Sequence, residues 1–210
     1  MIRIAAAVAA ILFFAAWAAP AEADFNLEVQ RCNSGSDHPD IRIISCTRNI
    51  NSGRFVGSNL AIAFYNRAVA YRETGQWDKA IADYTEAISL DPDDADIFNS
   101  RGNAYYGDGQ FDQAIDDYDQ AIDLDPSLPE AFSNRGNVYR KAGKFDLAIE
   151  DYGRAMDLRP GDGQIVANRG LAYEKMGDRE QAVQDFKTAF NLGFFHPLLL
   201  KKLNQYGADP

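Results

Sequence analysis

The chain has 210 residues, of which 46% are hydrophobic and 25% charged, so it is long enough for one large domain or an extended array of repeats. Its 21 basic and 31 acidic residues give a net charge of −10, which argues against nucleic acid as a partner because phosphate binding needs a cationic surface. With two histidines and two cysteines, the composition also argues against a histidine-based catalytic triad, a histidine-rich metal site and a four-cysteine zinc site.

Residues 1–23 have the pattern of a signal peptide. Arg3 precedes an unbroken apolar stretch over 4–19, which is shorter than the roughly 20 residues of a membrane span. Small residues near the end of the segment fit cleavage after Ala23. We therefore expect an exported protein, periplasmic or secreted, whose mature chain begins at Asp24 and has no membrane span. An uncleaved N-terminal anchor is the alternative.

The segment 24–60 contains both cysteines. Cys32 lies in a polar, turn-rich stretch, and Cys46 lies in a predicted helix that opens near Pro39. In an oxidising compartment an even pair of cysteines predicts a disulfide, which would staple the lead stretch onto that helix. A redox-active pair is the alternative, although such pairs usually have the spacing C-x-x-C.

From residue 61 onward the sequence repeats every 34 residues. Identical residues recur at this spacing in five registers: Pro92, Pro126 and Pro160; Tyr71, Tyr105, Tyr139 and Tyr173; Gly75, Gly109, Gly143 and Gly177; Ala80, Ala114, Ala148 and Ala182; Ala87, Ala121, Ala155 and Ala189. We define four repeats from this period: repeat 1 (61–94), repeat 2 (95–128), repeat 3 (129–162) and repeat 4 (163–196).

Each repeat contains two helical patterns separated by a glycine. In repeat 1, Phe64, Ala68 and Tyr71 recur on one helix face, and Gly75 supplies the positive φ that ends that helix. The second helix stops at an Asp-Pro pair, because the residue before proline disfavours helix. Ser127–Glu130 has the spacing of a capping box at the start of repeat 3.

This pattern resembles the tetratricopeptide repeat family, whose 34-residue unit is a helix–turn–helix. The matching residues of repeat 2 are Phe98, Gly102, Tyr105, Phe111, Ala114, Tyr118, Ala121 and Pro126. The resemblance covers 61–196. It implies an all-α fold, a right-handed superhelical solenoid of antiparallel helix pairs that binds its partner in a concave groove.

The sequence departs from the family pattern in several places. Repeat 4 has Arg179 where an aromatic residue is usual and Phe194 where proline is usual, which predicts a loosened last repeat. Residues 37–53 look like the second helix of a degenerate preceding unit, a half-repeat with Ile43, Cys46 and Ile50 facing inward.

The C-terminal segment 197–210 is predicted to be a capping helix, because a solenoid must cover its terminal apolar face. Its apolar side chains form one stripe: Leu199, Leu200, Leu203 and Tyr206. Lys201 and Lys202 are expected to face solvent. A dimer contact through this helix is the alternative.

We find no catalytic constellation, phosphate loop or metal-ligand spacing, so we predict a protein that is not an enzyme and uses no cofactor. Four aspartates follow one outer stripe of a helix: Asp112, Asp116, Asp119 and Asp123. We interpret them as a solvated face, because the backbone-carbonyl loop of a calcium site is missing. Repeats 1 and 2 are the acidic ones, so the alternatives are a basic partner docked there or a role in solubility alone.

The family resemblance implies that the first helices of the repeats line a groove for a peptide or an extended protein segment. The residues predicted to face this groove are Tyr65, Asn66, Asn99, Asn103, Tyr106, Asn134, Asn137, Arg140, Lys141 and Asn168. Asparagine suits this role because its amide both donates to and accepts from a peptide backbone. The alternative for Asn66, Asn134 and Asn168, which recur at multiples of 34, is that they bond neighbouring helices.

Position seven of every repeat is arginine where the family usually has leucine. Sixteen residues later each repeat has an aspartate, giving the pairs Arg67–Asp83, Arg101–Asp117, Arg135–Asp151 and Arg169–Asp185. We predict that these pairs bridge helices as a structural ladder. The alternative is that the arginines face the groove and bind an anionic ligand.

These observations leave two functional classes. The first is a non-catalytic scaffold, periplasmic or secreted, that binds a protein or peptide. The second is an adaptor subunit of an envelope enzyme or transport complex.

Overall fold

The computed structural model describes residues 26–34 and 38–208, which form helices joined by short loops, with no β-strand in these ranges. The predicted all-α class and the packing of consecutive helices are confirmed. Two compact parts are present, an N-terminal part up to Pro92 and a C-terminal part from Asp93. The predicted signal peptide, 1–23, lies outside the described residues.

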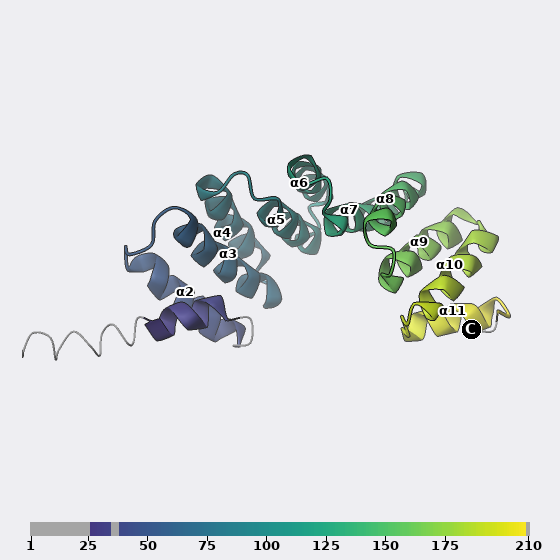
Figure 1. Cartoon of the computed structure of the whole chain (residues 1–210), viewed down its shortest axis with the longest axis horizontal. Coiled ribbons are helices and arrows are strands. Elements are labelled where there is room, and N and C mark those ends of the chain that lie inside the picture. Colours follow the sequence, from purple (N-terminus) through teal and green to yellow (C-terminus); the bar gives the residue numbers. More distant parts are fainter. Residues whose placement is uncertain (1–25, 35–37, 209–210) are drawn as a thin grey trace, which may run out of the picture. The chain divides into compact units, whose positions relative to one another are not determined.

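The N-terminal part consists of a helical segment at 26–33, then α2 (Pro39–Asn51), α3 (Ser58–Glu73) and α4 (Trp77–Leu90) (Figure 1). A disulfide joins Cys32 to Cys46, and both cysteines are buried.

Cys32 was predicted to lie in a turn-rich stretch, but the structure places it in a helix over 26–33; residues 35–37 of that stretch lie outside the described residues. Leu27, Glu28, Gln30 and Arg31 are good helix formers, and the turn-forming cluster begins only after them. A helix therefore precedes α2, and the disulfide joins the two.

Polar side chains dominate the buried face of α2. Arg42 and Asn49 are buried, whereas Ile43 and Ile50, predicted to face inward, are only partly buried. Both groups are paired at one atom: Arg42 pairs with Glu73 of α3, and Asn49 Nδ2 donates to the Glu28 carbonyl over 3.3 Å. Arg42 Nε and Asn49 Oδ1 are buried without a hydrogen-bond partner, so the polar face of α2 is only partly compensated.

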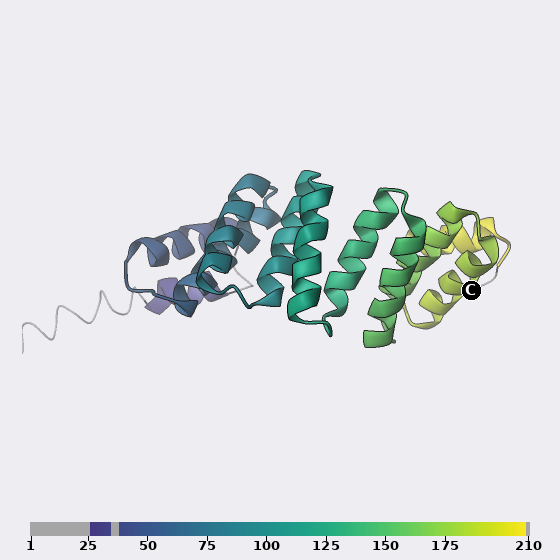
Figure 2. The same ribbon diagram turned by 90° about the horizontal axis from the view of Figure 1, so that it is seen from above.

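The C-terminal part contains α5 (Ala95–Asp108), α6 (Phe111–Leu124), α7 (Pro129–Lys141), α8 (Phe145–Leu158), α9 (Gly163–Met176), α10 (Arg179–Asn191) and α11 (Pro197–Gln205). Each helix packs against the next in the chain, and the first helices also contact one another, α5 with α7 and α7 with α9. Figures 1 and 2 show these helices following one another in chain order. Repeats 2 to 4 each contain one helix pair.

A glycine facing an aromatic ring holds each of these helix pairs close together. A Cβ on Gly102 would lie 2.7 Å from Cε1 of Tyr118, and one on Gly170 would lie 2.8 Å from Cε1 of Phe186. Both rings are at most 1% exposed. The recurring small residues are therefore explained by packing.

Four helices end at the predicted glycines, but α7 does not begin with the predicted capping box. A positive φ occurs after α3, α5, α7 and α9, at Gly75, Gly109, Gly143 and Gly177. At the start of α7, however, the N-cap is Leu128, which makes no side-chain capping bond. Ser127 Oγ instead donates to Asp125 Oδ1 over 2.6 Å, because the Asp125 side chain organises the turn.

The last helix, α11, covers the end of repeat 4. Leu199 and Leu203 are 3% and 0% exposed, as expected for the inner stripe, but Leu200 is 37% exposed. The prediction for Lys202 was wrong: its ammonium does not face solvent but donates to Glu174 of α9 over 2.8 Å. Lys202 of the nine-residue helix α11 lies against α9, where the Glu174 carboxylate compensates its partial burial.

Candidate functional site

The first helices of repeats 2 to 4 form one surface of the C-terminal part. We call it the first-helix face and define it by Asn103 and Tyr106 on α5, Asn137 and Arg140 on α7, and Leu171 on α9. These residues lie at equivalent positions of the 34-residue period, and their helices are in contact. Four of the predicted groove residues, Asn103, Tyr106, Asn137 and Arg140, therefore lie at matching positions of two adjacent helices.

A buried tyrosine holds each central asparagine of this face. The Tyr118 hydroxyl donates to Asn103 Oδ1 over 2.8 Å, and the Tyr152 hydroxyl donates to Asn137 Oδ1 over 2.8 Å. Arg140 Nε donates to the same Tyr152 oxygen over 3.2 Å. With its carbonyl occupied, each carboxamide is fixed in orientation and presents its N–H donors.

The tyrosine in this network is a structural rather than a titrating group. Burial raises the pKa of Tyr152, and the hydrogen bond and charge of Arg140 act in the opposite direction. The hydroxyl therefore stays protonated and remains a donor to Asn137 at neutral pH.

Three other asparagines predicted for the groove bond neighbouring helices. Asn134 Nδ2 donates to Asn99 Oδ1 over 3.0 Å, linking α7 to α5. In the N-terminal part, Asn66 Nδ2 donates to Asn33 Oδ1 over 3.1 Å. Tyr65 makes an edge-to-face contact with Tyr84, with ring centroids 5.6 Å apart. The bonds made by Asn66 and Asn134 match the helix-bonding alternative, and Asn99 is the acceptor of one of them.

Lys141 is exposed but lies against two aromatic rings of the preceding repeat. Its ammonium is 5.1 Å from the ring centroid of Tyr106 and 4.7 Å from that of Phe111. Cation–π contacts of this kind hold the lysine stem along the surface. The side chain keeps its positive charge at the edge of the first-helix face.

The four arginines at position seven each make a two-point contact with the aspartate sixteen residues later. In every pair Nε donates to Oδ2 and Nη2 donates to Oδ1, at 2.7–2.9 Å. The arginine side chains are 15–24% exposed and the aspartates 4–9%. Such fork-to-fork pairs neutralise both charges, so this geometry favours the structural role over binding of an anion.

Arg135 and Arg67 also reach the preceding helix. Arg135 Nη1 donates to Asp119 of α6 over 2.5 Å, and Arg67 Nη1 donates to Thr47 of α2 over 3.0 Å. Asp119 is therefore not part of a purely solvated acidic face, because it joins repeat 2 to repeat 3. In the sequence the contact corresponds to an aspartate sixteen residues before Arg135, at a position where repeats 1 and 3 have Thr85 and Gly153.

The electrostatics of the Arg135 cluster follow from burial and pairing. The hydrogen bond to Asp151 raises the pKa of the Arg135 guanidinium, and burial opposes this. Burial raises the pKa of the Asp151 carboxyl, against the effect of Arg135. The directions are the same for Arg101 and Asp117.

A pocket between α9, α10 and α11 was not predicted from the sequence. It has a volume of about 260 Å³, and Asn168 lies in its wall with Phe186, Phe194 and Leu199. The apolar stripe of α11 and the unusual Phe194 were the only signals in the sequence. They did not show that the last repeat and the capping helix leave a cavity between them.

The described residues show neither a metal site nor a membrane-spanning helix. No group of three or more His, Cys, Asp or Glu side chains in these ranges is arranged to hold a metal ion. None of the helices at 26–34 and 38–208 combines the length and apolar character needed to cross a bilayer.

The fold and this face define a helical repeat protein whose repeats each present polar and aromatic side chains from their first helix. Tetratricopeptide repeat models match residues 68–109 and 102–143 (TPR repeat), and 129–162 and 164–192 (both Tetratricopeptide repeat). Together these matches cover more than half of the chain. The protein belongs to the tetratricopeptide repeat family.

Several solved structures have the same fold. The crystal structure of MamA is 27% identical with a TM-score of 0.66, over 74% of this chain and 88% of that one. YrrB, described as a TPR protein with an unusual peptide-binding site, is 19% identical with a TM-score of 0.62, over 78% and 82%. The first TPR of Spaghetti (RPAP3), bound to the HSP90 peptide SRMEEVD, is 26% identical with a TM-score of 0.56, over 60% and 99%. A comparison with curated protein sequences finds no match.

Proposed function

We propose that this protein is a non-catalytic scaffold that binds an extended peptide or protein segment along the first-helix face. The observation that carries the proposal is the pair Asn103 and Asn137, each fixed by a buried tyrosine at the same position of successive repeats. Amide donors repeated along one surface match the repeated carbonyls of an extended backbone. The structure of the RPAP3 repeat with a bound peptide supports this use of the fold.

The side chains of the first-helix face favour hydrogen bonds to a peptide backbone over binding of a C-terminal carboxylate. The position-seven arginines are neutralised by their aspartates. Arg140 donates to Tyr152, and Lys141 lies over Tyr106 and Phe111. A carboxylate would therefore find few uncommitted cations for charge-assisted bonds.

We also propose that the protein acts outside the cytoplasm, in the periplasm or the exterior. The apolar stretch at 4–19 and the small residues before Asp24 support this proposal. The disulfide between Cys32 and Cys46 supports it as well, because such bonds persist in oxidising compartments.

The test is a binding measurement on a partner isolated by affinity purification from the exported fraction of the source cells. Asn103→Asp combined with Asn137→Asp keeps an oxygen that accepts from each tyrosine but removes the amide donors. Two lost hydrogen bonds of about 0.5–1.5 kcal/mol each predict roughly a 5–150-fold weaker Kd. Asn191→Asp combined with Asn204→Asp adds the same charge at exposed sites on α10 and α11 and serves as the control.

The measured affinities distinguish binding on the first-helix face from binding elsewhere on the protein. Circular dichroism should show the same helicity for both double variants. Equal affinity of the Asn103/Asn137 variant and the control would place the binding site elsewhere, on the acidic face of α6 or on α11.

A further inference from the structure

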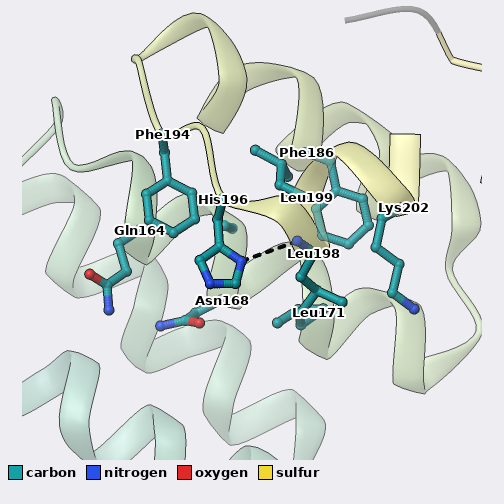
Figure 3. A pocket seen from close by; sticks show the side chains of 10 residues that line it. Gln164, Asn168, Leu171, Phe186, Phe194, His196, Leu198, Leu199 and Lys202 are labelled. Atoms are coloured by element: carbon teal, nitrogen blue, oxygen red, sulfur yellow. Dashed lines mark hydrogen bonds between the residues drawn. The ribbon is translucent and has the colours of Figure 1, made fainter. Parts of the chain in front are cut away.

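The pocket at the end of repeat 4 is apolar in its depth. Figure 3 shows it between α9, α10 and the segment that enters α11. Phe186 and Leu199 are 1% and 3% exposed and lie deepest among its lining residues. Leu171 and Leu198 line it from α9 and α11. The apolar surface that remains accessible in the pocket therefore comes from partly exposed side chains such as Leu171 and Leu198, which lie over the two buried ones.

Two stacked rings form another wall of the pocket. The rings of Phe194 and His196 are 5.8 Å apart at their centroids and 8° from parallel. His196 is held in place because its Nδ1 accepts a hydrogen bond from the backbone N–H of Leu198, which caps α11 (Figure 3). This cap fixes the wall in position without help from a ligand.

The pocket carries no uncompensated charge. Lys202 is the one lysine that lines it, and its ammonium lies 2.7 Å from a carboxylate oxygen of Glu174. The Tyr206 hydroxyl donates to the same carboxylate. A charged group entering the pocket would lose its hydration without gaining a free counter-charge, so the site favours an uncharged occupant.

The rim of the pocket carries two side-chain amides on α9. Gln164 and Asn168 are one helical turn apart, and Figure 3 shows both beside the opening, next to Phe194 and His196. Asn168 occupies the position of Asn134 in the repeat before, and Leu171 that of Asn137. The pocket therefore continues the first-helix face, with amides at the rim and an apolar floor.

The volume limits the size of the occupant. A cavity of about 150 Å³ lined by apolar side chains holds one benzene, whereas drug-sized ligands need about 300–1,000 Å³. The 260 Å³ found here suits one large side chain and is too small for a drug-sized ligand. The amides at the rim suit the peptide groups on either side of that side chain.

We propose that this pocket takes one large, uncharged apolar side chain, of the size of leucine, methionine or phenylalanine, from the peptide segment bound by the protein. The proposal rests on the function proposed above and adds a sequence requirement to it. The partner segment carries a bulky apolar residue where it meets repeat 4, and the side-chain amides of the first-helix face form hydrogen bonds with the backbone next to that residue.

The test uses single amino-acid probes and NMR of the isotope-labelled full chain. N-acetyl-phenylalanine amide and N-acetyl-leucine amide are titrated, with N-acetyl-glycine amide and N-acetyl-glutamate amide as controls. We expect saturable shifts of the Gln164 and Asn168 side-chain amides with the two apolar probes in the millimolar range, and none with the two controls.

Two variants of α11 provide a matched comparison. Leu198→Lys places a charge at the pocket wall, and Leu200→Lys places the same charge on the same helix outside it; the two leucines are 42% and 37% exposed. We expect Leu198→Lys to weaken binding of the phenylalanine probe at least tenfold and Leu200→Lys to leave it within twofold. His196→Asn removes the ring wall while keeping a side-chain oxygen to cap α11, and should also weaken binding.

Each failure has a distinct meaning. Shifts of equal size with the glycine or glutamate probe, no saturable shift, or equal effects of Leu198→Lys and Leu200→Lys would each overturn the pocket proposal. If partner binding still depends on Asn103 and Asn137 in that case, the proposed scaffold function stands without the pocket.

Discussion

The contact between Arg135 and Asp151 allows the most direct test of the reasoning about the helix pairs. Arg135 on α7 donates two hydrogen bonds to Asp151 on α8 and a third to Asp119 on α6. The side chain of Asp151 is 5% exposed, that of Arg135 20% and that of Asp119 46%. Replacing Arg135 by leucine, the residue usual at this position in the family, leaves the Asp151 carboxylate buried without its counter-charge.

The expected loss follows from that burial. Removing one partner of a buried ion pair costs about 3–5 kcal/mol. For a chain of this size about 1 kcal/mol corresponds to 2–4 °C in Tm, so Arg135→Leu should lower Tm by about 6–20 °C. Asp151→Leu should lower Tm less, because Arg135 keeps Asp119 and is more exposed.

The double variant Arg135→Leu/Asp151→Leu should recover much of the loss, since it leaves neither member of the pair unpaired. Thermal unfolding followed by circular dichroism gives the three values and the coupling between the two sites, which we expect to reach about 1–3 kcal/mol. The control is Arg154 and Asp157, an exposed pair on α8 separated by 4.0 Å, whose coupling should stay below about 0.5 kcal/mol. Simple additivity at Arg135 and Asp151 would refute the structural ladder.

Two further predictions concern the ends of the described chain. Burial acts to raise the pKa of Glu174, but the hydrogen bonds from Lys202 and Tyr206 outweigh it and hold that pKa below its ordinary value of 4.5. The carboxylate therefore stabilises the folded state above pH 4.5, and this contribution is lost as the pH falls from there through the lowered pKa. The Tm difference between the parent protein and Glu174→Gln should have its largest value at pH 7 and become smaller below pH 4.5. A Tm difference that does not change with pH would contradict this prediction. At the other end, replacing Cys32 and Cys46 together by serine should destabilise the protein by about 3 kcal/mol, the chain-entropy value for a loop of about 15 residues. Mass spectrometry of the unreduced parent should show a chain that starts at Asp24 and lacks two hydrogens, whereas two free thiols would exclude the bond.

The 34-residue period made much of the fold predictable from the sequence. Every repeat occupies the same environment, so the same residue types recur wherever packing demands them. A glycine opposite an aromatic ring, as at Gly102 and Tyr118, appears in the chain as a fixed spacing. For the same reason the sixteen-residue separation of Arg135 and Asp151 was enough to predict a pair between the two helices of a repeat.

The face of the candidate site was predictable, but the state of its side chains was not. The period placed Asn103 and Asn137 at equivalent positions, and these lie on one surface. It did not show that each accepts from a buried tyrosine, nor that Asn134 is used in a bond to Asn99. Which of several polar atoms within reach become partners depends on side-chain distances of a few tenths of an ångström, and the spacing of residues along a chain does not resolve these.

Only the tertiary structure decided what happens where the period breaks. Before the first repeat, the disulfide between Cys32 and Cys46 joins the helix at 26–33 to α2. Asp119 reaches Arg135 although no other repeat has an aspartate at that position. At the far end repeat 4 has no successor, so α11 covers it with a shorter helix, pairs Lys202 with Glu174 and leaves a pocket above Phe186. A periodic sequence determines the contacts that every repeat shares, whereas contacts at the ends and between unlike neighbours depend on how particular side chains fit in space.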